Sequence, residues 1–343
     1  MATRIAINGC GRIGRAFLKK ALEHSELEIV AVNDLAPVEN IAYLIKYDST
    51  YGKSSHAVEV KAGDTPELKI GKNNIKYLSV REPSELPWGD LDIDIVVEST
   101  GLFATYEKSK AHLDAGAKRV VISAPVKGDP VEGVTGATVL MGVNEELLKT
   151  CNISSNASCT TNAGSPLISI LSETIGIEKA VLNTVHGYTA SQGLVDGPHK
   201  KNVRLGRAAG INIVPTSTGA AIATTKAIPE LEGKFDGIAL RVPVVAGSMV
   251  DVTFISKRPT TVEEVNKALS DAALSDRWSG IFATTTEELV STDILGEPYA
   301  SIADLNLTRV IDGNLIKVCA WYDNEGGYTH ALVAHVLSVS SHV

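Results

Sequence analysis

The segment Ser155–Asn162, which reads SNASCTTN, places a cysteine where covalent chemistry could occur. The apolar spacing that follows predicts a helix over residues 158–174, with Ser158 or a neighbour as its N-cap, so Cys159 would lie in the first turn. The positive end of a helix dipole lowers the pKa of a nearby thiol and increases the fraction of reactive thiolate. Cys159 is therefore a candidate nucleophile, and a buried structural cysteine is the alternative that this local pattern leaves open.

A glycine-rich turn near the start of the chain is the second candidate site. Gly9, Gly11 and Gly14 form a GxGxxG pattern between a predicted strand and a predicted helix, which suits the pyrophosphate of a dinucleotide. Asp34 ends the next predicted strand about 20 residues further on, where a carboxylate binds the adenosine ribose. Its charge repels a 2′-phosphate, and Leu35 offers no cation to receive one, so the pattern favours NAD over NADP. A merely structural turn is the alternative.

The elements around this turn predict a nucleotide-binding domain. Apolar periodicity alternates between strands and helices, and a polar stretch over residues 51–80 indicates short hairpin strands. We expect strands over 4–8, 28–33, 93–98 and 119–123, and helices over 12–23, 38–46 and 106–115. This order predicts an α/β domain over residues 1–157 with a doubly wound parallel sheet of the Rossmann type.

The pattern changes after Asn156, where longer strands follow one another with few helices between them. Strands over 180–186, 237–244 and 248–256 predict an α+β catalytic domain over residues 158–326 with a mostly antiparallel sheet. The polar, glycine-rich stretch over 190–212 is long for an unstructured connection and suggests a functional loop. A C-terminal helix within 327–343 is expected to pack back on the first domain.

The composition narrows the class of partner. The 343 residues carry a formal net charge of −8 with a pI near 5.6, so no global basic field is available for nucleic acid or an anionic membrane. Any anion site must therefore be local. One cationic cluster interrupts this acidic chain, and it comprises His199, Lys200, Lys201, Arg204 and Arg207. The alternative is that this cluster is simply a solvated loop.

The four cysteines show neither CxxC pairs nor zinc-ligand spacing, so we expect no metal and free thiols in a reducing compartment. No apolar run reaches the ~20 residues that span a bilayer. Because Met1–Arg4 lead directly into a strand, no signal or transit peptide is expected either. These observations predict a cytoplasmic protein without a membrane partner.

Six further segments extend the likeness of the cysteine motif to one family. They are NGCGRIGR (8–15), KYDS (46–49), VHGYT (185–189), VPTSTGAA (214–221), RVP (241–243) and WYDNEGGY (321–328). In this order they resemble the phosphorylating glyceraldehyde-3-phosphate dehydrogenases, and the resemblance runs from residue 4 nearly to the end. It implies NAD-dependent oxidation of glyceraldehyde 3-phosphate, with inorganic phosphate as second substrate, to 1,3-bisphosphoglycerate in glycolysis and gluconeogenesis.

The resemblance also implies a role for individual residues. Cys159 would carry a thioester, and His186 would be the catalytic base, forming an ion pair with the thiolate. The backbone N–H of Cys159 and the His186 side chain would stabilise the oxyanion. Cofactor contacts would come from Gly9, Gly11, Arg12, Ile13, Gly14, Asp34, Arg81, Ser123 and Asn324, the last holding the nicotinamide carboxamide, while Pro198 goes with NAD preference.

Two anion sites are implied by the same resemblance. Thr189 and Arg241, with Ser191 nearby, would hold the substrate phosphate, and Ser158, Thr160, Thr218 and Gly219 would hold inorganic phosphate. Arg241 lies within an apolar strand, where a buried charge needs a partner. The loop over 190–212 resembles a segment at subunit contacts, which implies a homotetramer.

Several positions depart from the family pattern, and rival functions remain. Cys10, Ala163 and Gly326 replace usual residues near the nicotinamide, and Leu205 stands where many bacterial relatives carry an arginine. The nearest rival is an erythrose-4-phosphate dehydrogenase, which passes the thioester to water. Non-phosphorylating aldehyde dehydrogenases and semialdehyde dehydrogenases fit less well, and a binding protein that retains only the fold is the rival from another class.

Overall fold

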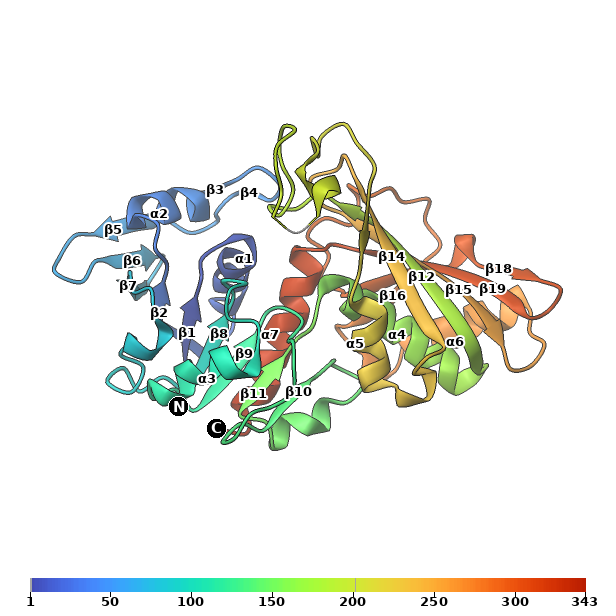
Figure 1. Ribbon diagram of the computed structural model, residues 1–343, viewed down its shortest axis with the longest axis horizontal. Coiled ribbons are helices and arrows are strands. Elements are labelled where there is room, and N and C mark those ends of the chain that lie inside the picture. Colours follow the sequence, from blue (N-terminus) through green and yellow to red (C-terminus); the bar gives the residue numbers. More distant parts are fainter. Residues whose placement is uncertain (1, 201) are drawn as a thin grey trace. The chain divides into compact units, whose positions relative to one another are not determined.

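The computed structural model describes residues 2–200 and 202–343. Met1 and one member of the cationic cluster, Lys201, lie outside the described residues. The chain divides into two compact units, one formed by Met1–Ala157 with Leu332–Val343 and the other by Ser158–Ala331. Each unit contains one large sheet (Figure 1). The expected combination of a doubly wound parallel sheet with a mostly antiparallel one is confirmed.

The first sheet has the order β10-β11-β9-β8-β1-β2-β7-β6-β5. All neighbouring pairs from β10 to β7 are parallel, and only β6 and β5 are added as antiparallel edge strands. The strands are β1 (Thr3–Asn8), β2 (Leu27–Asn33), β5 (Val58–Lys61), β6 (Glu67–Ile70), β7 (Asn73–Leu78), β8 (Ile95–Glu98), β9 (Arg119–Ile122), β10 (Gly136–Thr138) and β11 (Ile153–Ser155). A separate short hairpin joins β3 (Tyr47–Asp48) to β4 (Gly52–Lys53).

The expectation for residues 51–80 was partly wrong, because β7 joins the parallel sheet beside β2 and is not confined to a hairpin. Its apolar positions Ile75 and Tyr77 are buried, which a strand inside the sheet requires. The strand beside which β7 pairs is far away in the sequence, so the local pattern of this segment could not predict it.

Both faces of the first sheet are covered, as its side-chain alternation requires. Ile5 and Ile7 of β1 lie in one buried cluster with residues of α1 (Arg12–Ala21), α2 (Val38–Lys46) and the end of α7 (Gly326–Ser340). Ala6, between them, packs on the opposite face with Trp88, and α3 (Tyr106–Asp114) contributes to a third cluster. The last turns of α7 supply Leu332 and Val336 to the first cluster, so they belong to the core of this unit.

The second sheet has the order β13-β14-β12-β15-β19-β17-β16, with β18 paired to β19. Most pairs are antiparallel, but β12 runs parallel to β14 and β16 parallel to β17. The strands are β12 (Ile177–Gly187), β13 (Val214–Ser217), β14 (Phe235–Val242), β15 (Ser248–Ser256), β16 (Phe282–Thr285), β17 (Ser301–Asp304), β18 (Arg309–Ile311) and β19 (Leu315–Tyr322). The helices are α4 (Cys159–Thr174), α5 (Ala220–Ala227) and α6 (Val262–Ala273).

One face of this sheet carries the central helix. The alternating burial of β15 directs Val250, Val252 and Phe254 inward, and α4 packs against β12, β15, β17 and β19. The sequence did not predict α5, α6 or β19. This packing fixes the start of α4, and hence Cys159, over the sheet.

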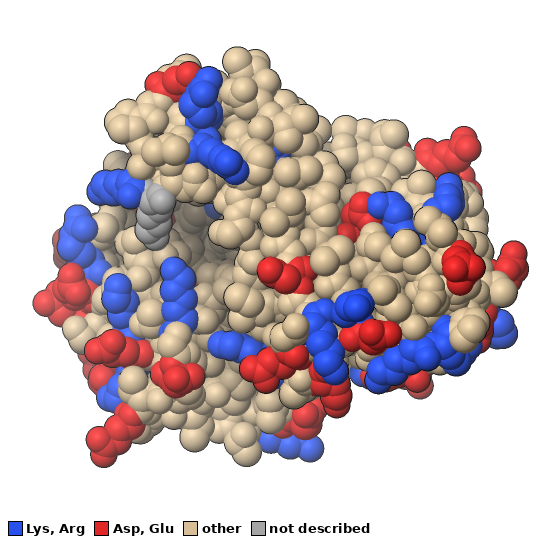
Figure 2. Space-filling model, turned by 45° about the vertical axis from the view of Figure 1, so that its right-hand side comes forward, with Lys and Arg blue, Asp and Glu red and all other residues tan. Residues whose placement is uncertain are grey.

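Charged side chains are mixed over the surface. On the face drawn in Figure 2, Lys and Arg alternate with Asp and Glu without a broad area of one sign. Within the cationic cluster, Arg207 forms a salt bridge with Asp196 at 3.0 Å. Among the described residues, no helix combines the length and apolar character needed to cross a bilayer.

Candidate active site

Cys159 is the first residue of α4, and Ser158 is its N-cap. The Ser158 hydroxyl accepts a hydrogen bond from the Thr161 N–H at 3.1 Å, as the sequence predicts for a residue that caps the helix. Ala157 just before it adopts a left-handed conformation (φ 55), which turns the chain into the helix. The thiol is half-buried at the end of the helix where the dipole is positive.

His186 comes to this thiol from β12. Its Nε2 lies 3.3 Å from Cys159 Sγ, although 27 residues separate the two in the chain. The parallel pairing of β12 with β14 sets His186 opposite Arg241, and Nη1 of Arg241 lies 2.6 Å from His186 Nδ1. The register of two strands therefore brings together three of the residues singled out in the sequence.

Burial and neighbouring groups shift the pKa values of this pair. Burial raises the pKa of the Cys159 thiol, while Arg241 and hydrogen bonds in the first turn of α4 act to lower it. Burial, with a further contribution from Arg241, lowers the pKa of His186 to about 3, and the Gly187 carbonyl opposes this shift. Burial thus acts against the charged form of each group, whereas the first turn of α4 favours the thiolate, and the thiolate–imidazolium pair implied by the resemblance stays a prediction.

Tyr322 is part of this site and was not predicted individually. Its hydroxyl lies 2.7 Å from Thr184 Oγ1 and 3.0 Å from Thr160 Oγ1. Its ring meets the His186 ring edge-on at 5.9 Å between centroids. The Thr160 hydroxyl is therefore held by a phenol in a buried position, and its contact with inorganic phosphate stays a prediction. The only sequence signal for Tyr322 was its place in the WYDNEGGY segment.

The other phosphate candidates lie on loops of the same unit. Thr189 Oγ1 and Ser191 Oγ are 2.9 Å apart beyond the end of β12. Gly219 is the N-cap of α5, and Thr218 Oγ1 accepts from the Ala220 N–H at 3.2 Å. Each group thus presents hydroxyl or backbone donors of the kind that bind phosphate.

Asn324 follows β19 and is fixed by two hydrogen bonds. Its Oδ1 accepts from the Gly247 N–H at 3.0 Å and from the Ser248 hydroxyl at 2.9 Å. Because both bonds use the oxygen, the amide nitrogen is the group that can donate to a carbonyl such as that of nicotinamide.

The glycine-rich turn in the first unit has the shape that a dinucleotide needs. Gly9 has φ 94, and a Cβ there would lie 2.6 Å from the Thr100 nitrogen. A Cβ on Gly14 would lie 2.0 Å from the Gly9 carbonyl oxygen, so α1 can approach β1 only without one. α1 has no side-chain cap at Gly11, which suits an anion at its N-terminus.

A cavity of about 520 Å³ adjoins this turn at the carboxyl ends of β1 and β2. Its lining includes Gly9, Gly11, Asp34, Leu35 and Arg81. The Asp34 carboxylate accepts from the Cys10 and Ala36 N–H groups at 2.7 and 2.9 Å, which holds it at the end of β2. These residues fit a dinucleotide.

The remaining cofactor candidates have other contacts. Arg12 forms a salt bridge with Asp48 at 2.9 Å, Ile13 packs against the core, and the Ser123 hydroxyl donates to the Glu98 carbonyl at 3.1 Å. Pro198 is exposed on the loop after β12. Their roles toward NAD stay predictions.

A buried network that the sequence did not predict lies behind the turn. Glu98 is 1% exposed, and its carboxylate accepts from Asn8 Nδ2 at 2.6 Å and from the Thr100 N–H at 2.8 Å. His112 receives the Trp88 indole N–H at Nδ1 (3.0 Å), so its Nε2–H can donate to Glu98 at 3.1 Å. The network fixes the ends of the strands that line the cavity.

The other cysteines lack the environment of Cys159. All four are free, and Cys10, Cys151 and Cys319 are buried. Burial raises the pKa of Cys10 to about 12 and that of Cys319 to about 11. Within residues 2–200 and 202–343, no group of three or more His, Cys, Asp and Glu side chains could hold a metal ion.

Comparison with known proteins identifies the family of the chain. Residues 3–106 match the family model described as "Glyceraldehyde 3-phosphate dehydrogenase, NAD binding domain", and residues 158–324 match the model of the C-terminal domain of the same family. A glyceraldehyde-3-phosphate dehydrogenase of Mycobacterium avium is 48% identical over 340 residues, with 97% of each chain covered. The chain belongs to the glyceraldehyde-3-phosphate dehydrogenase family.

Relatives from Streptomyces give the same result. Glyceraldehyde-3-phosphate dehydrogenase 1 of Streptomyces avermitilis is 46% identical over 99% of both chains. Glyceraldehyde-3-phosphate dehydrogenase 2 of Streptomyces arenae is 47% identical over 97% of both. As a member of this family the chain is an NAD-dependent oxidoreductase, so NAD is its cofactor and the predicted cofactor choice is confirmed.

Proposed function

We propose that the chain oxidises glyceraldehyde 3-phosphate with NAD and transfers the acyl group to inorganic phosphate, giving 1,3-bisphosphoglycerate in glycolysis and gluconeogenesis. The observation that carries the proposal is the contact of Cys159 Sγ with His186 Nε2 at 3.3 Å, with Arg241 2.6 Å from the other ring nitrogen. A nucleophile, a base and a cation for phosphate then surround one position. This constellation, not the fold, supports the chemistry.

In the first half of the reaction, Cys159 Sγ attacks the aldehyde carbon, and the thiol proton moves to His186 Nε2. The former carbonyl oxygen is stabilised by hydrogen bonds from the Cys159 N–H and His186, and it takes this proton back from His186 to become the hydroxyl of the hemithioacetal. Bound NAD would supply the hydride acceptor for this carbon, and His186, neutral again, would take the hydroxyl proton as base. A thioester on Cys159 remains.

In the second half, an oxygen of inorganic phosphate attacks the thioester carbon and the carbon–sulfur bond breaks. The departing thiolate is stabilised by the first turn of α4 and by His186. The products are an acyl phosphate and the free thiol.

The proposed substrate contacts follow the two groups of donors. Arg241, Thr189 and Ser191 would bind the phosphate of the aldehyde, because a guanidinium and two hydroxyls suit a dianion. Ser158, Thr160, Thr218 and Gly219 would bind inorganic phosphate. Support for a shared site comes from the Ser165 and Thr224 hydroxyls, which lie 3.0 Å apart and tie α4 to α5.

The division of labour between the units is part of the proposal. The first unit would bind NAD through Gly9, Gly11, Arg12, Ile13, Gly14, Asp34, Arg81 and Ser123, and the second would supply catalysis and Asn324. The glycine turn and the 520 Å³ cavity support the first role. Free thiols are consistent with a reducing, cytoplasmic location.

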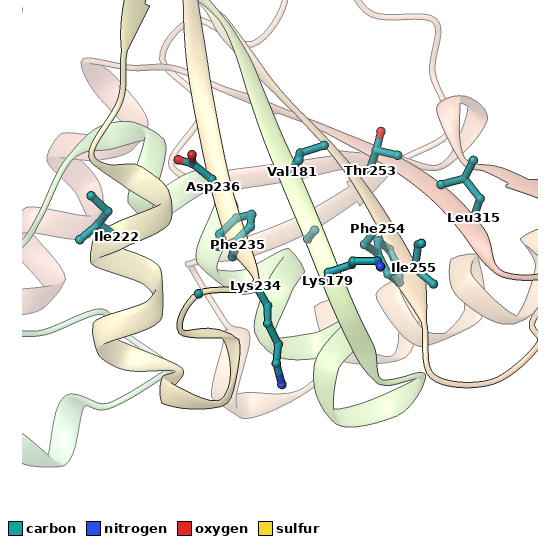
Figure 3. A pocket seen from close by; sticks show the side chains of 12 residues that line it. Lys179, Val181, Ile222, Lys234, Phe235, Asp236, Thr253, Phe254, Ile255 and Leu315 are labelled. Carbon is teal, nitrogen blue, oxygen red and sulfur yellow. The ribbon is translucent and has the colours of Figure 1, made fainter.

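Assembly into a homotetramer is supported by two apolar surfaces. On the sheet face away from α4, a hollow of about 720 Å³ is bordered by Val181, Thr253 and Leu315 (Figure 3). Val181 is 59% exposed, and Oδ1 of Asn183 on the same strand is buried without a partner in the described chain. The second surface lies on the loop over 190–212, where the apolar side chains of Leu194 and Val203 are each exposed. Self-association would cover such surfaces.

Sedimentation analysis of Val181→Asp tests the assembly. We expect the wild type to sediment as a tetramer and the variant as a smaller species, because a charge at this contact is not tolerated. Thr253→Ser, a neutral change on the same face, should leave the tetramer intact. A monomeric wild type would exclude the assembly.

The activity itself is tested by NADH formation from glyceraldehyde 3-phosphate, with and without inorganic phosphate. Turnover should depend on phosphate and disappear in Cys159→Ser, whereas Cys151→Ala, which changes a buried cysteine of the other unit, should stay active. Phosphate-independent turnover would indicate a hydrolytic enzyme. Faster turnover of erythrose 4-phosphate would favour the erythrose enzyme, which the names of the relatives do not favour. RNA binding without turnover would indicate a binding protein.

A further inference from the structure

The turn that joins β2 to α2 carries Asp34 and borders two cavities. The first is the 520 Å³ cavity beside the glycine-rich turn, whose lining includes Asp34 and Leu35. The second has a volume of about 450 Å³, and its lining includes Leu35, Ala36 and Pro37. Leu35 borders both cavities and is 48% exposed. Because open volume adjoins the turn in both places, close packing alone does not hold it in position.

A hydrogen bond from Tyr77 of β7 ties this turn to the core. The Tyr77 hydroxyl donates to the Ala36 carbonyl oxygen at 2.6 Å. The Tyr77 side chain is 4% exposed and belongs to the same buried cluster as Ile5 and Ile7 of β1. Since the ring is enclosed by the core, its hydroxyl is a fixed point from which the turn is held.

The position of Ala36 in turn sets the orientation of the Asp34 carboxylate. Oδ1 of Asp34 accepts from the Ala36 N–H at 2.9 Å, and Oδ2 accepts from the Cys10 N–H at 2.7 Å. Each carboxylate oxygen therefore has a backbone donor, one from each of two turns. Tyr77 does not touch the cavity beside the glycine-rich turn, but it acts on Asp34 through Ala36.

The orientation of Asp34 matters because the same cavity also contains cations. Arg81 and Lys108 both belong to its lining. A guanidinium and an ammonium group attract phosphate, so the cavity as a whole does not exclude a dinucleotide with a 2′-phosphate. Exclusion depends on a carboxylate that stays where the 2′-phosphate would lie, since two negative charges repel strongly at short distance.

We propose that Tyr77 is a specificity-determining residue for the cofactor, because its hydroxyl holds the Asp34–Pro37 turn and thereby keeps the Asp34 carboxylate beside the adenosine ribose. Tyr77 is a positioning residue in this account, since it acts through Ala36 and Asp34. The inference rests on the proposed contact of Asp34 with the ribose and deepens it.

Loss of the Tyr77 hydroxyl would free the turn to move toward the second cavity. The Asp34 carboxylate would then spend less time beside the ribose. A ligand with free ribose hydroxyls would lose an ordered acceptor, and a ligand with a 2′-phosphate would meet less repulsion. Both changes shift the preference between the two ligands in the same direction.

Calorimetric titration of the full-length protein with two cofactor fragments tests the proposal. The fragments are ADP-ribose and 2′-phospho-ADP-ribose, which differ only in the 2′-phosphate. The wild type should bind ADP-ribose more tightly. In Tyr77→Phe the ratio of the two dissociation constants should fall by about fivefold or more, as expected when one hydrogen bond is lost. General loosening of the unit would weaken both fragments alike and leave the ratio unchanged.

Two further variants show whether the effect belongs to this hydrogen bond. Tyr106→Phe removes the hydroxyl of another buried tyrosine, which lies in a different cluster of the same unit, and should keep the ratio within about twofold of the wild type. Asp34→Ala removes the carboxylate on which Tyr77 acts. Adding Tyr77→Phe to Asp34→Ala should therefore change the ratio by less than about twofold.

The proposal would be overturned by an unchanged ratio in Tyr77→Phe, or by a full effect of Tyr77→Phe in the absence of Asp34. Tyr77→Phe should fold, because Ala36 and Tyr77 both line the second cavity and water can replace the lost donor there. If it does not, Tyr77→Met also fills the core position without a hydroxyl, and the same ratio is expected.

The proposed reaction has a separate readout in phosphate-dependent NADH formation by the wild type. Turnover together with an unchanged ratio in Tyr77→Phe would reject the role of Tyr77 alone. A lowered ratio in Tyr77→Phe without turnover by the wild type would support that role and reject the reaction.

Discussion

His186 and His335 are both buried histidines with a pKa lowered to about 3, yet their surroundings differ. His335, in the first unit, lies 2.7 Å from the Ser154 hydroxyl through Nε2 and 3.2 Å from Asn156 Oδ1 through Nδ1. One tautomer satisfies both contacts, because the hydroxyl donates and the amide oxygen accepts. His186, in the second unit, has no tautomer that satisfies both neighbours of Nδ1.

The same contrast extends to the two sites. The dinucleotide turn is shaped by backbone and by a Glu98 carboxylate whose partners are compatible donors. The catalytic site is built from side chains, one of which competes for a ring nitrogen. A histidine whose neighbours all fit one tautomer stabilises the fold. A histidine whose neighbours require different tautomers has more than one state, and a ligand can select one of them.

The largest effect expected from this contrast is on catalysis. His186→Asn should lower kcat by about 10³-fold, because no other described residue places a basic side chain against Cys159 Sγ. Steady-state NADH formation is the measurement, and NAD binding should be unchanged. His335→Asn, the matched variant in the first unit, should retain kcat once folded. Equal losses in both would show that the two histidines do not differ in function.

A backbone prediction concerns the dinucleotide turn. Gly9→Ala would place a Cβ only 2.6 Å from the Thr100 nitrogen on a residue with φ 94. The free energy of unfolding, measured in urea, should therefore fall by at least about 2 kcal/mol. A Cβ on Gly11 meets no atom within 4 Å. Gly11→Ala should therefore keep its stability and weaken NAD about tenfold by obstructing the pyrophosphate. If both variants lost stability alike, the turn would not be shaped as described.

Many elements of both units could be predicted from the sequence because their signals are local. The helix over 38–46 and the strand over 248–256 have the predicted bounds, and the cap at Ser158 was correct within its motif. β7 was misplaced and β19 was missed, since a strand is defined by a partner that the local pattern does not name.

The site divides in the same way. Cys159, His186 and Arg241 could be named from motifs, but their contacts depend on the parallel register of β12 and β14. No spacing in the sequence shows that Arg241 would compete for Nδ1, or that Tyr322 would hold Thr160. The ionisation of the predicted thiolate pair also depends on burial, which is a property of the whole fold, and it stays a prediction.

The pH dependence of stability can sharpen the comparison through His335. Its pKa is about 3 in the folded protein and 6.5 otherwise, because burial disfavours the charged form. Below pH 6.5 the unfolded chain binds a proton that the folded chain does not, so stability is lost down to about pH 3 at up to ~1.4 kcal/mol per pH unit. In urea titrations His335→Gln should show a shallower decline than the wild type. Parallel curves would mean that His335 is already charged when folded.

The smallest effect is expected for Asp48, which forms a salt bridge with Arg12. Arg12 is a candidate contact of NAD in the first unit, as Arg241 is of the substrate phosphate in the second. Burial acts to raise the pKa of Asp48, but the Thr50 and Tyr51 amides and Arg12 outweigh it and hold the pKa below 3.8. Its contribution to stability is thus present above pH 3.8 and is lost as pH falls through the lower folded pKa. Asp48→Asn should cost less than about 1 kcal/mol at pH 7, and nothing in strong acid.

The same variant measures whether Arg12 depends on its salt bridge with Asp48. Arg241, by contrast, forms no salt bridge with a described carboxylate. Arg12 has its own carboxylate at 2.9 Å, so its position does not await a ligand. Fluorescence titration should therefore give an NAD affinity for Asp48→Asn within about threefold of the wild type, because an ion pair of this kind contributes little. A tenfold change would show that Arg12 exchanges Asp48 for the ligand. The contrast between the two units would then hold for their histidines but not for their arginines.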